Sequence, residues 1–309
     1  RRVEGGVALI LGCCGAISEW AGRYEMTEKV NEQLKQELAK LGDPVIIAGC
    51  PSCMKQLKEN IGAEVRGIWE ILKEIGLPGK ARGLEMPVAI HDACGARGDT
   101  QTQDTIRELL ADMGCTVVNT EYSRDLSPCC GYGGLTAYAN KEMAAKMTEK
   151  CLERSDAPYI TYCMACRDRF AREGRESRHI LELLYGDNAC NMPDISEKRY
   201  NRLVLKEKLL KNIWNEELMM EKKDYTVAYT EDVIRMMDER MILKSDVEHV
   251  LADYRESQEA VFDEETKELV TRSRLGNVTF WVRFVETEEG YLVHRAYSHR
   301  MNIMKRVGQ

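Results

Sequence analysis

The chain has 309 residues, a formal net charge of −7 and 44% hydrophobic residues, a composition typical of a folded protein with a core. The negative charge and the lack of a basic stripe argue against nucleic-acid binding. No apolar run approaches the ~20 residues of a membrane-spanning helix. The start, RRVEGGVALI, does not fit a signal peptide, because its apolar run is short and no small-residue cleavage site follows. We therefore expect a cytoplasmic protein, and since residue 1 is not Met we expect the chain to begin inside a longer protein.

Short apolar runs alternate with amphipathic helical stretches up to about residue 190. Continuous apolar strands that alternate with helices are typical of parallel sheets with helices on both faces. The strand candidates, in chain order, are GVALIL (6–11), PVIIAG (44–49), PVAIH (87–91), CTVVNT (115–120) and PYITY (158–162).

An internal repeat runs through this region. The segments LGCCGA, AGCPSCMKQLKENI and IWEILKEIG of the first half correspond to SPCCGY, TYCMACRDRFAREG and HILELLYG of the second. The repeat predicts a domain over residues 1–192 made of two pseudo-equivalent α/β lobes, at about 1–82 and 83–192.

Beyond residue 192 the cysteines stop and the pattern changes. Residues 193–228 are predicted to form a linker helix, with its charged amphipathic part at 201–223. The remaining 229–309 predict a small α+β domain that ends in a β-hairpin, GNVTFWVRFVETEEGYLVHRAYS. We expect this part to dock a partner or another part of the chain.

Two adjacent cysteines stand in LSPCCGYGG, residues 126–134. Neighbouring Cα atoms lie about 3.8 Å apart, whereas a relaxed disulfide needs about 4.4–6.8 Å, so a bridge between them would be strained. Two adjacent thiolates fit better as ligands of one metal centre, and the glycines let the backbone approach a bulky group. The alternative is a glycine-rich turn with two buried thiols. Twelve cysteines without a secretion signal favour metal ligation or redox chemistry over a disulfide framework.

The cysteine spacing repeats as well. A CC pair, a gap of 32 to 35 residues and a C-x-x-C pair occur twice, and several of these cysteines follow strand candidates. Sites in open α/β sheets gather at the carboxyl ends of strands, so we expect the cysteines to meet. The second motif comprises Cys94, Cys129, Cys130, Cys163 and Cys166, and the first comprises Cys13, Cys14, Cys50 and Cys53.

This pattern resembles the cysteine-rich CCG domain of the heterodisulfide reductase B subunit, which also occurs in iron–sulfur subunits of glycolate and glycerol-3-phosphate dehydrogenases. IHDACGARGD is similar to that family's strand ending in His-Asp-Pro-Cys, with Ala93 in place of Pro. The resemblance covers residues 6–190 and implies paired Rossmann-like lobes with parallel sheets. It also implies a non-cubane [4Fe–4S] cluster on Cys94, Cys129, Cys130, Cys163 and Cys166.

The first motif departs from the family pattern because its leading cysteine is missing. By analogy with the second half, that cysteine would lie about 35 residues before Cys13, so we expect the first lobe to be truncated. Cys13, Cys14, Cys50 and Cys53 could then hold zinc, a second [4Fe–4S] cluster or nothing. Some relatives carry zinc at one motif.

The resemblance implies a heterodisulfide-reductase-like oxidoreductase component that passes electrons through its cluster and could reduce a disulfide or thiol substrate. GCCGAISEWAG lacks the G-x-G-x-x-G spacing of a dinucleotide site. The expected electron donors are therefore flavin- and ferredoxin-type iron–sulfur subunits, or upstream domains of the same chain. Two alternatives remain: a pure electron relay in a flavin-dependent complex, and a zinc-stabilised interaction module without a redox role.

Other cysteines and histidines are weaker candidates. Cys115, Cys151 and Cys190 match no motif position and are expected to be buried structural thiols. His91 could hydrogen-bond a cluster sulfur or be a satisfied histidine at the end of a strand. His179 could cap the helix that it opens or reach the cluster from outside its ligands.

Overall fold

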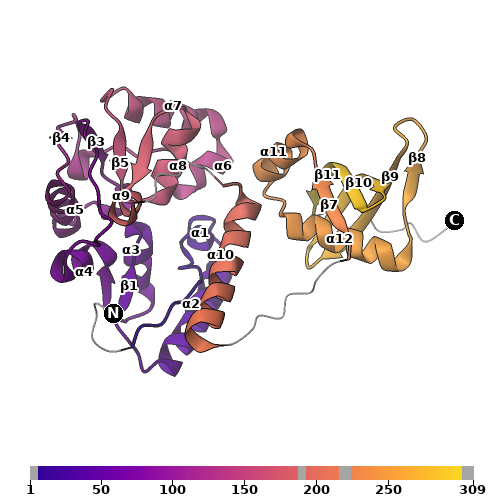
Figure 1. Ribbon diagram of the computed structural model, residues 1–309, viewed down its shortest axis with the longest axis horizontal. Helices are drawn as coiled ribbons and strands as arrows, with labels where there is room; N and C mark the ends of the chain where they lie inside the picture. The colour runs from indigo at the N-terminus through magenta and orange to yellow at the C-terminus, as the bar shows by residue number, and fades with distance from the viewer. Residues whose placement is uncertain (1–5, 187–192, 216–223, 301–309) are drawn as a thin grey trace. The chain divides into compact units, whose positions relative to one another are not determined.

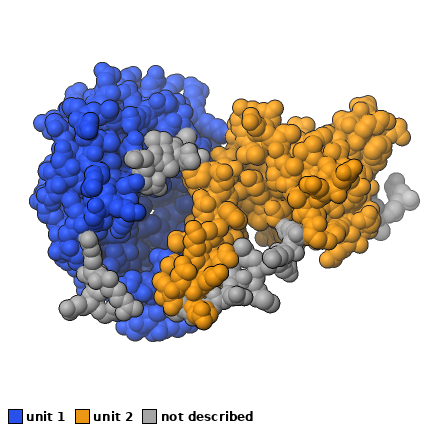
Figure 2. Space-filling model, viewed as in Figure 1, with its two compact units in different colours: residues 1–192 blue, residues 193–309 orange. Residues whose placement is uncertain are grey.

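The computed structural model describes residues 6–186, 193–215 and 224–300 (Figure 1). The chain divides into two compact units, residues 1–192 and residues 193–309 (Figure 2). The first unit is α/β with parallel sheets, and the second is built on a mixed sheet with helices. The fold class predicted from the sequence is confirmed.

The second half of the first unit is a four-stranded parallel sheet with the strand order β4-β3-β5-β6. The apolar runs at 87–91 and 158–162 correctly predict its two inner strands, and β3 is buried along its whole length. The elements are β3 (Val88–His91), η1 (Cys94–Ala96), α5 (Thr100–Asp112), β4 (Val117–Val118), η2 (Arg124–Leu126), η3 (Gly133–Leu135), α6 (Thr136–Ala139), α7 (Lys141–Leu152), β5 (Tyr159–Thr161), α8 (Met164–Arg172), β6 (Ser177–His179) and α9 (Ile180–Tyr185).

The first half repeats part of this arrangement. Its strands β1 and β2 form a two-stranded parallel sheet, and the series β1-α3-β2-α4 has the same order as β5-α8-β6-α9. The sequence repeat is thus a repeat of supersecondary structure. The elements are α1 (Ala16–Trp20), α2 (Tyr24–Lys40), β1 (Ile46–Ala48), α3 (Pro51–Asn60), β2 (Val65–Gly67) and α4 (Ile68–Ile75).

The strand predicted over residues 6–11 is wrong. These residues form neither helix nor strand, and Val7 and Leu9 are 73% and 53% exposed. A strand needs a neighbour that completes its backbone hydrogen bonds and covers its side chains. In the described residues β1 pairs only with β2, whereas its counterpart β5 pairs with strands on both edges. In the second half β3 joins β4, the strand before the CC pair, to β5, and the described residues hold no counterpart of β3 that would pair with the run at 6–11.

The two halves share one hydrophobic core, and the second half has a smaller one of its own. Trp69 of α4 is fully buried and packs edge to face on Tyr162, with ring centroids 5.8 Å apart. The indole Nε1 of Trp69 also donates to the hydroxyl of Thr102 on α5, at 3.3 Å. Aromatic side chains contribute much of the energy of a core. The first half is therefore anchored to the second by burial of apolar surface.

The second unit is a five-stranded sheet with the order β7-β11-β10-β9-β8, in which only β7 and β11 are parallel. The predicted hairpin is formed by β10 and β11. Of the helix predicted over 201–223, residues 216–223 lie outside the described residues. The elements are α10 (Ile195–Leu209), η4 (Leu210–Trp214), β7 (Thr226–Tyr229), α11 (Glu231–Arg240), α12 (Lys244–Ser257), β8 (Val261–Asp263), β9 (Glu268–Leu275), β10 (Val278–Thr287) and β11 (Gly290–His299).

Across the described ranges, we find no helix with both the length and the apolar character needed to cross a membrane.

The glycine that follows each CC pair has a backbone conformation that other residues rarely adopt. Gly15 has a φ of 84° and Gly131 a φ of 91°. A Cβ on Gly131 would also lie 2.5 Å from the carbonyl oxygen of Ala144 in α7. This glycine therefore lets the chain turn sharply after the two cysteines and lie close against a helix.

We predict that Gly131→Ala lowers the free energy of unfolding by about 2–5 kcal/mol, because a positive φ costs about 1–2 kcal/mol and overpacking about 1–3 kcal/mol. Gly98→Ala is the matched control, since Gly98 has a φ of 78° but open space around its Cβ position. Gly98→Ala should lower the free energy of unfolding only by the cost of the positive φ, about 1–2 kcal/mol. Unfolding curves recorded side by side test this, and equal losses would show that the contact with α7 is not tight.

Candidate metal centre

Each C-x-x-C pair lies at the start of a helix that follows a parallel strand. Cys50 is the N-cap of α3 and Cys163 the N-cap of α8, while Cys53 and Cys166 fall in the first turns. Free backbone N–H groups and the helix dipole favour negative charge at this end of a helix. Hydrogen bonds from the thiols of Cys163 and Cys53, with backbone N–H groups adding to them, lower the pKa of Cys50 to about 2.

The CC pairs lie in loops beside these helix starts. Cys129 and Cys130 lie between η2 and η3, and Cys13 and Cys14 precede α1. Hydrogen bonds from the thiols of Cys130 and Cys94 lower the pKa of Cys129 to about 2.

All nine cysteines predicted as ligands are brought together. Hydrogen bonds between neighbouring thiols join them into one series, in which the contact between Cys50 and Cys163 links the two halves of the unit. The series runs Cys13, Cys14, Cys53, Cys50, Cys163, Cys166, Cys130, Cys129 and Cys94.

The thiols in this series differ in acidity because each shares protons with its neighbours. The pKa is lowered for Cys14, Cys50 and Cys129, which accept hydrogen bonds from neighbouring thiols. The neighbouring thiols supply the protons of these hydrogen bonds, and this role, together with burial, disfavours their ionisation. The pKa is raised for Cys53, Cys94, Cys130, Cys163 and Cys166. Bound metal cations would stabilise these sulfur atoms as thiolates, so the cluster of sulfur atoms fits a metal centre.

Burial differs between the two ends of the series. Cys130 and Cys166 are each 2% exposed, whereas Cys13 is exposed and Cys14 is half-buried. Including Cys14, six cysteines of the two motifs are half-buried, so the motifs differ only at the two ends of the range: the second has two buried cysteines and the first has one exposed cysteine.

A close backbone contact brings the two motifs together. A Cβ on Gly95, the residue after Cys94, would lie 2.8 Å from the hydroxyl oxygen of Ser52, which stands between Cys50 and Cys53. Only a residue without a side chain fits there. Gly95 thus allows the Cys94 loop to lie against the first turn of α3.

Asp92 fixes the loops around the second motif. Its carboxylate is 1% exposed and accepts two hydrogen bonds from Arg107, at 2.9 and 2.8 Å. It also accepts from the backbone N–H of Arg124 at 2.6 Å and from the hydroxyl of Tyr162 at 3.1 Å. Burial acts to raise the pKa of Asp92, but these hydrogen bonds outweigh it and the pKa lies below its ordinary value. One carboxylate therefore ties together the segments that carry Cys94, Cys129 and Cys163.

The cysteines outside the motifs do not join the series. Cys151 is fully buried, and its thiol donates to the carbonyl oxygen of Cys129 at 3.4 Å. Burial raises the pKa of Cys151 to about 11. Cys115 is buried in the shared core, and Cys190 lies outside the described residues. His179 acts as a cap, since its Nδ1 accepts from the backbone N–H of Leu181 at 3.2 Å.

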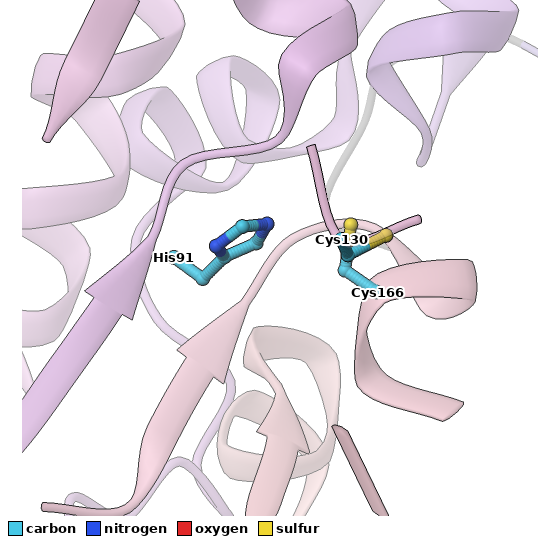
Figure 3. Close-up of side chains that lie close together, drawn as sticks. All are labelled: His91, Cys130 and Cys166. Carbon is cyan, nitrogen blue, oxygen red and sulfur yellow. The ribbon is translucent and has the colours of Figure 1, made fainter. Parts of the chain in front are cut away.

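His91 lies beside two of the motif cysteines, a point that the sequence left open. One ring nitrogen of His91 and the sulfur atoms of Cys130 and Cys166 all lie within 4.8 Å of one another (Figure 3). Burial, together with the positive charge of Arg154, lowers the pKa of His91 to about 3, so the ring is neutral at pH 7. Its Nε2 is buried and has no hydrogen-bond partner among the described residues. A buried polar atom without a partner is costly and indicates a group that the nitrogen would contact.

The model of the CCG family, described as a cysteine-rich domain, matches residues 9–58 and 88–171. The first unit is a cysteine-rich domain of the CCG type. The two matched segments contain both CC pairs, both C-x-x-C pairs and Cys94.

Three relatives match parts of this chain. An uncharacterized iron–sulfur protein of Methanocaldococcus jannaschii is 28% identical over 125 residues, which are 40% of this chain and 24% of the relative. One of Methanococcus maripaludis is 26% identical over 162 residues, 50% of this chain and 32% of the relative. An EtfAB:quinone oxidoreductase of Syntrophomonas wolfei is 23% identical over 195 residues, 55% of this chain and 27% of the relative. The chain thus spans about a quarter to a third of these relatives. No solved structure matches it significantly.

We predict that Asp92→Asn lowers the free energy of unfolding by about 2–4 kcal/mol, because it leaves the partly exposed Arg107 without its anion. Asp104→Asn, which removes an exposed partner of Arg124, is the control and should cost less than about 1 kcal/mol. The pKa of Asp92 is depressed by folding, so its contribution is present above the unfolded pKa of about 3.9 and is lost as the pH falls. The wild type and Asp92→Asn should therefore converge in acid. A difference that is constant from pH 7 to pH 3 would contradict this role.

Proposed function

We propose that the first unit binds a non-cubane [4Fe–4S] cluster through Cys94, Cys129, Cys130, Cys163 and Cys166 and serves as an electron-transfer component of an oxidoreductase. The observation that carries the proposal is the unbroken series of thiols, anchored at two helix N-termini and closed by the buried nitrogen of His91. The CCG family match and the two relatives named as iron–sulfur proteins support an iron–sulfur role. The non-cubane form rests on the resemblance to the heterodisulfide reductase B subunit.

The residues around the cysteines suit a bulky, negatively charged group. The first turns of α3 and α8 present backbone N–H groups to the thiolates. Gly133 lies beside the second motif, and even a Cβ there would be 3.5 Å from the sulfur of Cys129. A cluster bound there would accept and give up single electrons, at a potential set by its hydrogen bonds and its exposure.

The proposed substrate is a disulfide or thiol, and the proposed electron donors are flavin- and ferredoxin-type iron–sulfur subunits or other domains of the same chain. The relative named as an EtfAB:quinone oxidoreductase supports a place in a larger redox assembly. The alternative function is a pure electron relay, in which the same cluster transfers electrons but binds no substrate. The exposed Cys13 favours a second function for the first motif, in which four thiols hold zinc or a labile second [4Fe–4S] cluster.

Protein purified without oxygen should be brown and contain iron and acid-labile sulfide. The contrasting result, a colourless protein with stoichiometric zinc, would exclude both redox functions and favour the zinc-stabilised interaction module.

We predict that Cys130→Ser loses the cluster of the second motif while Cys151→Ser keeps it. Both thiols are buried, but only Cys130 contacts other motif thiols, and the serine hydroxyl in Cys151→Ser can still donate to the carbonyl of Cys129. Iron per chain and the visible absorption spectrum distinguish the two variants. Equal loss of iron in both would show that the ligands are assigned wrongly.

We also predict unequal occupancy of the two motifs. The second motif offers five cysteines, two of them buried, whereas the first offers four, with Cys13 exposed. A metal site depends on ligands held together in a folded shell. Metal analysis with anomalous scattering at the iron and zinc edges should find iron at the second motif, and zinc, a labile cluster or nothing at the first. Two equally occupied iron clusters would refute the prediction.

A further inference from the structure

His91 stands where β3 ends and is fully buried, in direct reach of two cysteines that lie far from it in the sequence. Figure 3 shows the outer edge of its imidazole ring turned towards the sulfur atoms of Cys130 and Cys166. The ring is held from one side by Phe170, in an edge-to-face contact with centroids 4.7 Å apart. The direction of the buried Nε2 is therefore fixed by packing.

Arg154 determines which ring nitrogen of His91 carries the proton. Its guanidinium donates from Nε to the carbonyl of Cys151 at 3.1 Å, and from Nη1 to the carbonyls of Glu121 and Tyr122, each at 3.2 Å. The remaining nitrogen, Nη2, lies 3.1 Å from Nδ1 of His91.

Arginine has only donors and stays charged in proteins, so Nδ1 of His91 must accept the hydrogen bond with its lone pair. The proton of the neutral ring then lies on Nε2, the nitrogen without a partner among the described residues. A protonated Nε2 has no lone pair left for a metal ion. It can only donate.

We propose that His91 is a positioning residue whose Nε2–H donates a hydrogen bond to the sulfur of Cys130 or Cys166 once the cluster is bound, and that it is not a metal ligand. The proposal rests on the iron–sulfur centre proposed above and adds a hydrogen bond that influences the reduction potential of the cluster. A hydrogen bond to a ligating thiolate disperses negative charge, and reduction adds negative charge to the centre. The hydrogen bond therefore favours the reduced state and raises the reduction potential.

Two variants of the full chain separate this role from packing and from ligation. His91→Phe keeps an aromatic ring against Phe170 but has no donor. His91→Gln places an amide N–H near the position of Nε2. We expect His91→Phe to keep the iron content of the wild type and to shift the midpoint potential to more negative values, and His91→Gln to restore most of that shift. Redox titration followed by electron paramagnetic resonance measures the potential, and metal analysis measures the iron.

A measurement on the wild type makes the test independent of how the variants fold. Protein labelled with ¹⁵N-histidine should show a weak nitrogen coupling in pulsed paramagnetic resonance of the reduced cluster, as expected for a nitrogen held through a hydrogen bond.

Several results would overturn the inference while leaving the cluster intact. A strong, directly bonded nitrogen coupling, or a loss of iron in His91→Phe as large as in Cys130→Ser, would make His91 a ligand. If His91→Phe keeps both its iron and the midpoint potential of the wild type, His91 makes no hydrogen bond to the cluster. If His91→Phe and His91→Gln shift the potential equally, His91 acts only through packing. A wild type without iron would instead overturn the proposed function, and this inference with it.

Discussion

The candidate metal centre depends on the contact between Cys50 and Cys163, the N-cap residues of two equivalent helices. Each half of the first unit places a C-x-x-C pair at a strand–helix junction, which is a consequence of the repeated βαβα order. The repeat alone gives two separate sites. The thiols form one series only because the two junctions meet. The sulfur atoms of one half then lie next to those of the other half.

That contact is maintained by features away from the sulfur atoms. Burial of Trp69 against Tyr162 and Thr102 fixes α4 of the first half to the second. Gly95 permits the backbone contact with Ser52 that closes the gap between the motifs. Loss of either would move α3 relative to α8, so the centre is sensitive to packing that involves no cysteine.

The sequence predicts the ligand candidates and the parallel sheets because cysteine spacing and continuous apolar runs are local signals. It does not predict β2 and β6, which are three residues long and carry Arg66 and Arg178 at their centres, so they lack an apolar run. The run at 6–11 has the composition of a strand, yet whether it joins a sheet depends on a partner strand. The pairing of His91 with Arg154 joins residues 63 positions apart, and no sequence pattern marks it.

Charge balance explains why the nitrogen of His91 matters. Three cationic side chains around the second motif are already engaged: Arg107 by Asp92, Arg154 by three backbone carbonyls, and Arg167 by Asp168 and Glu182. Thiolate charge in the buried part of the centre must therefore be offset by helix N-termini, by bound metal and by neutral N–H donors. At Cys130 and Cys166, which are each 2% exposed, solvent contributes little to this balance. The Nε2–H of His91 is a single neutral donor, whose direction is fixed by Phe170 and whose tautomer is fixed by Arg154. In this buried place it stabilises added negative charge more than the same donor would at the exposed Cys13.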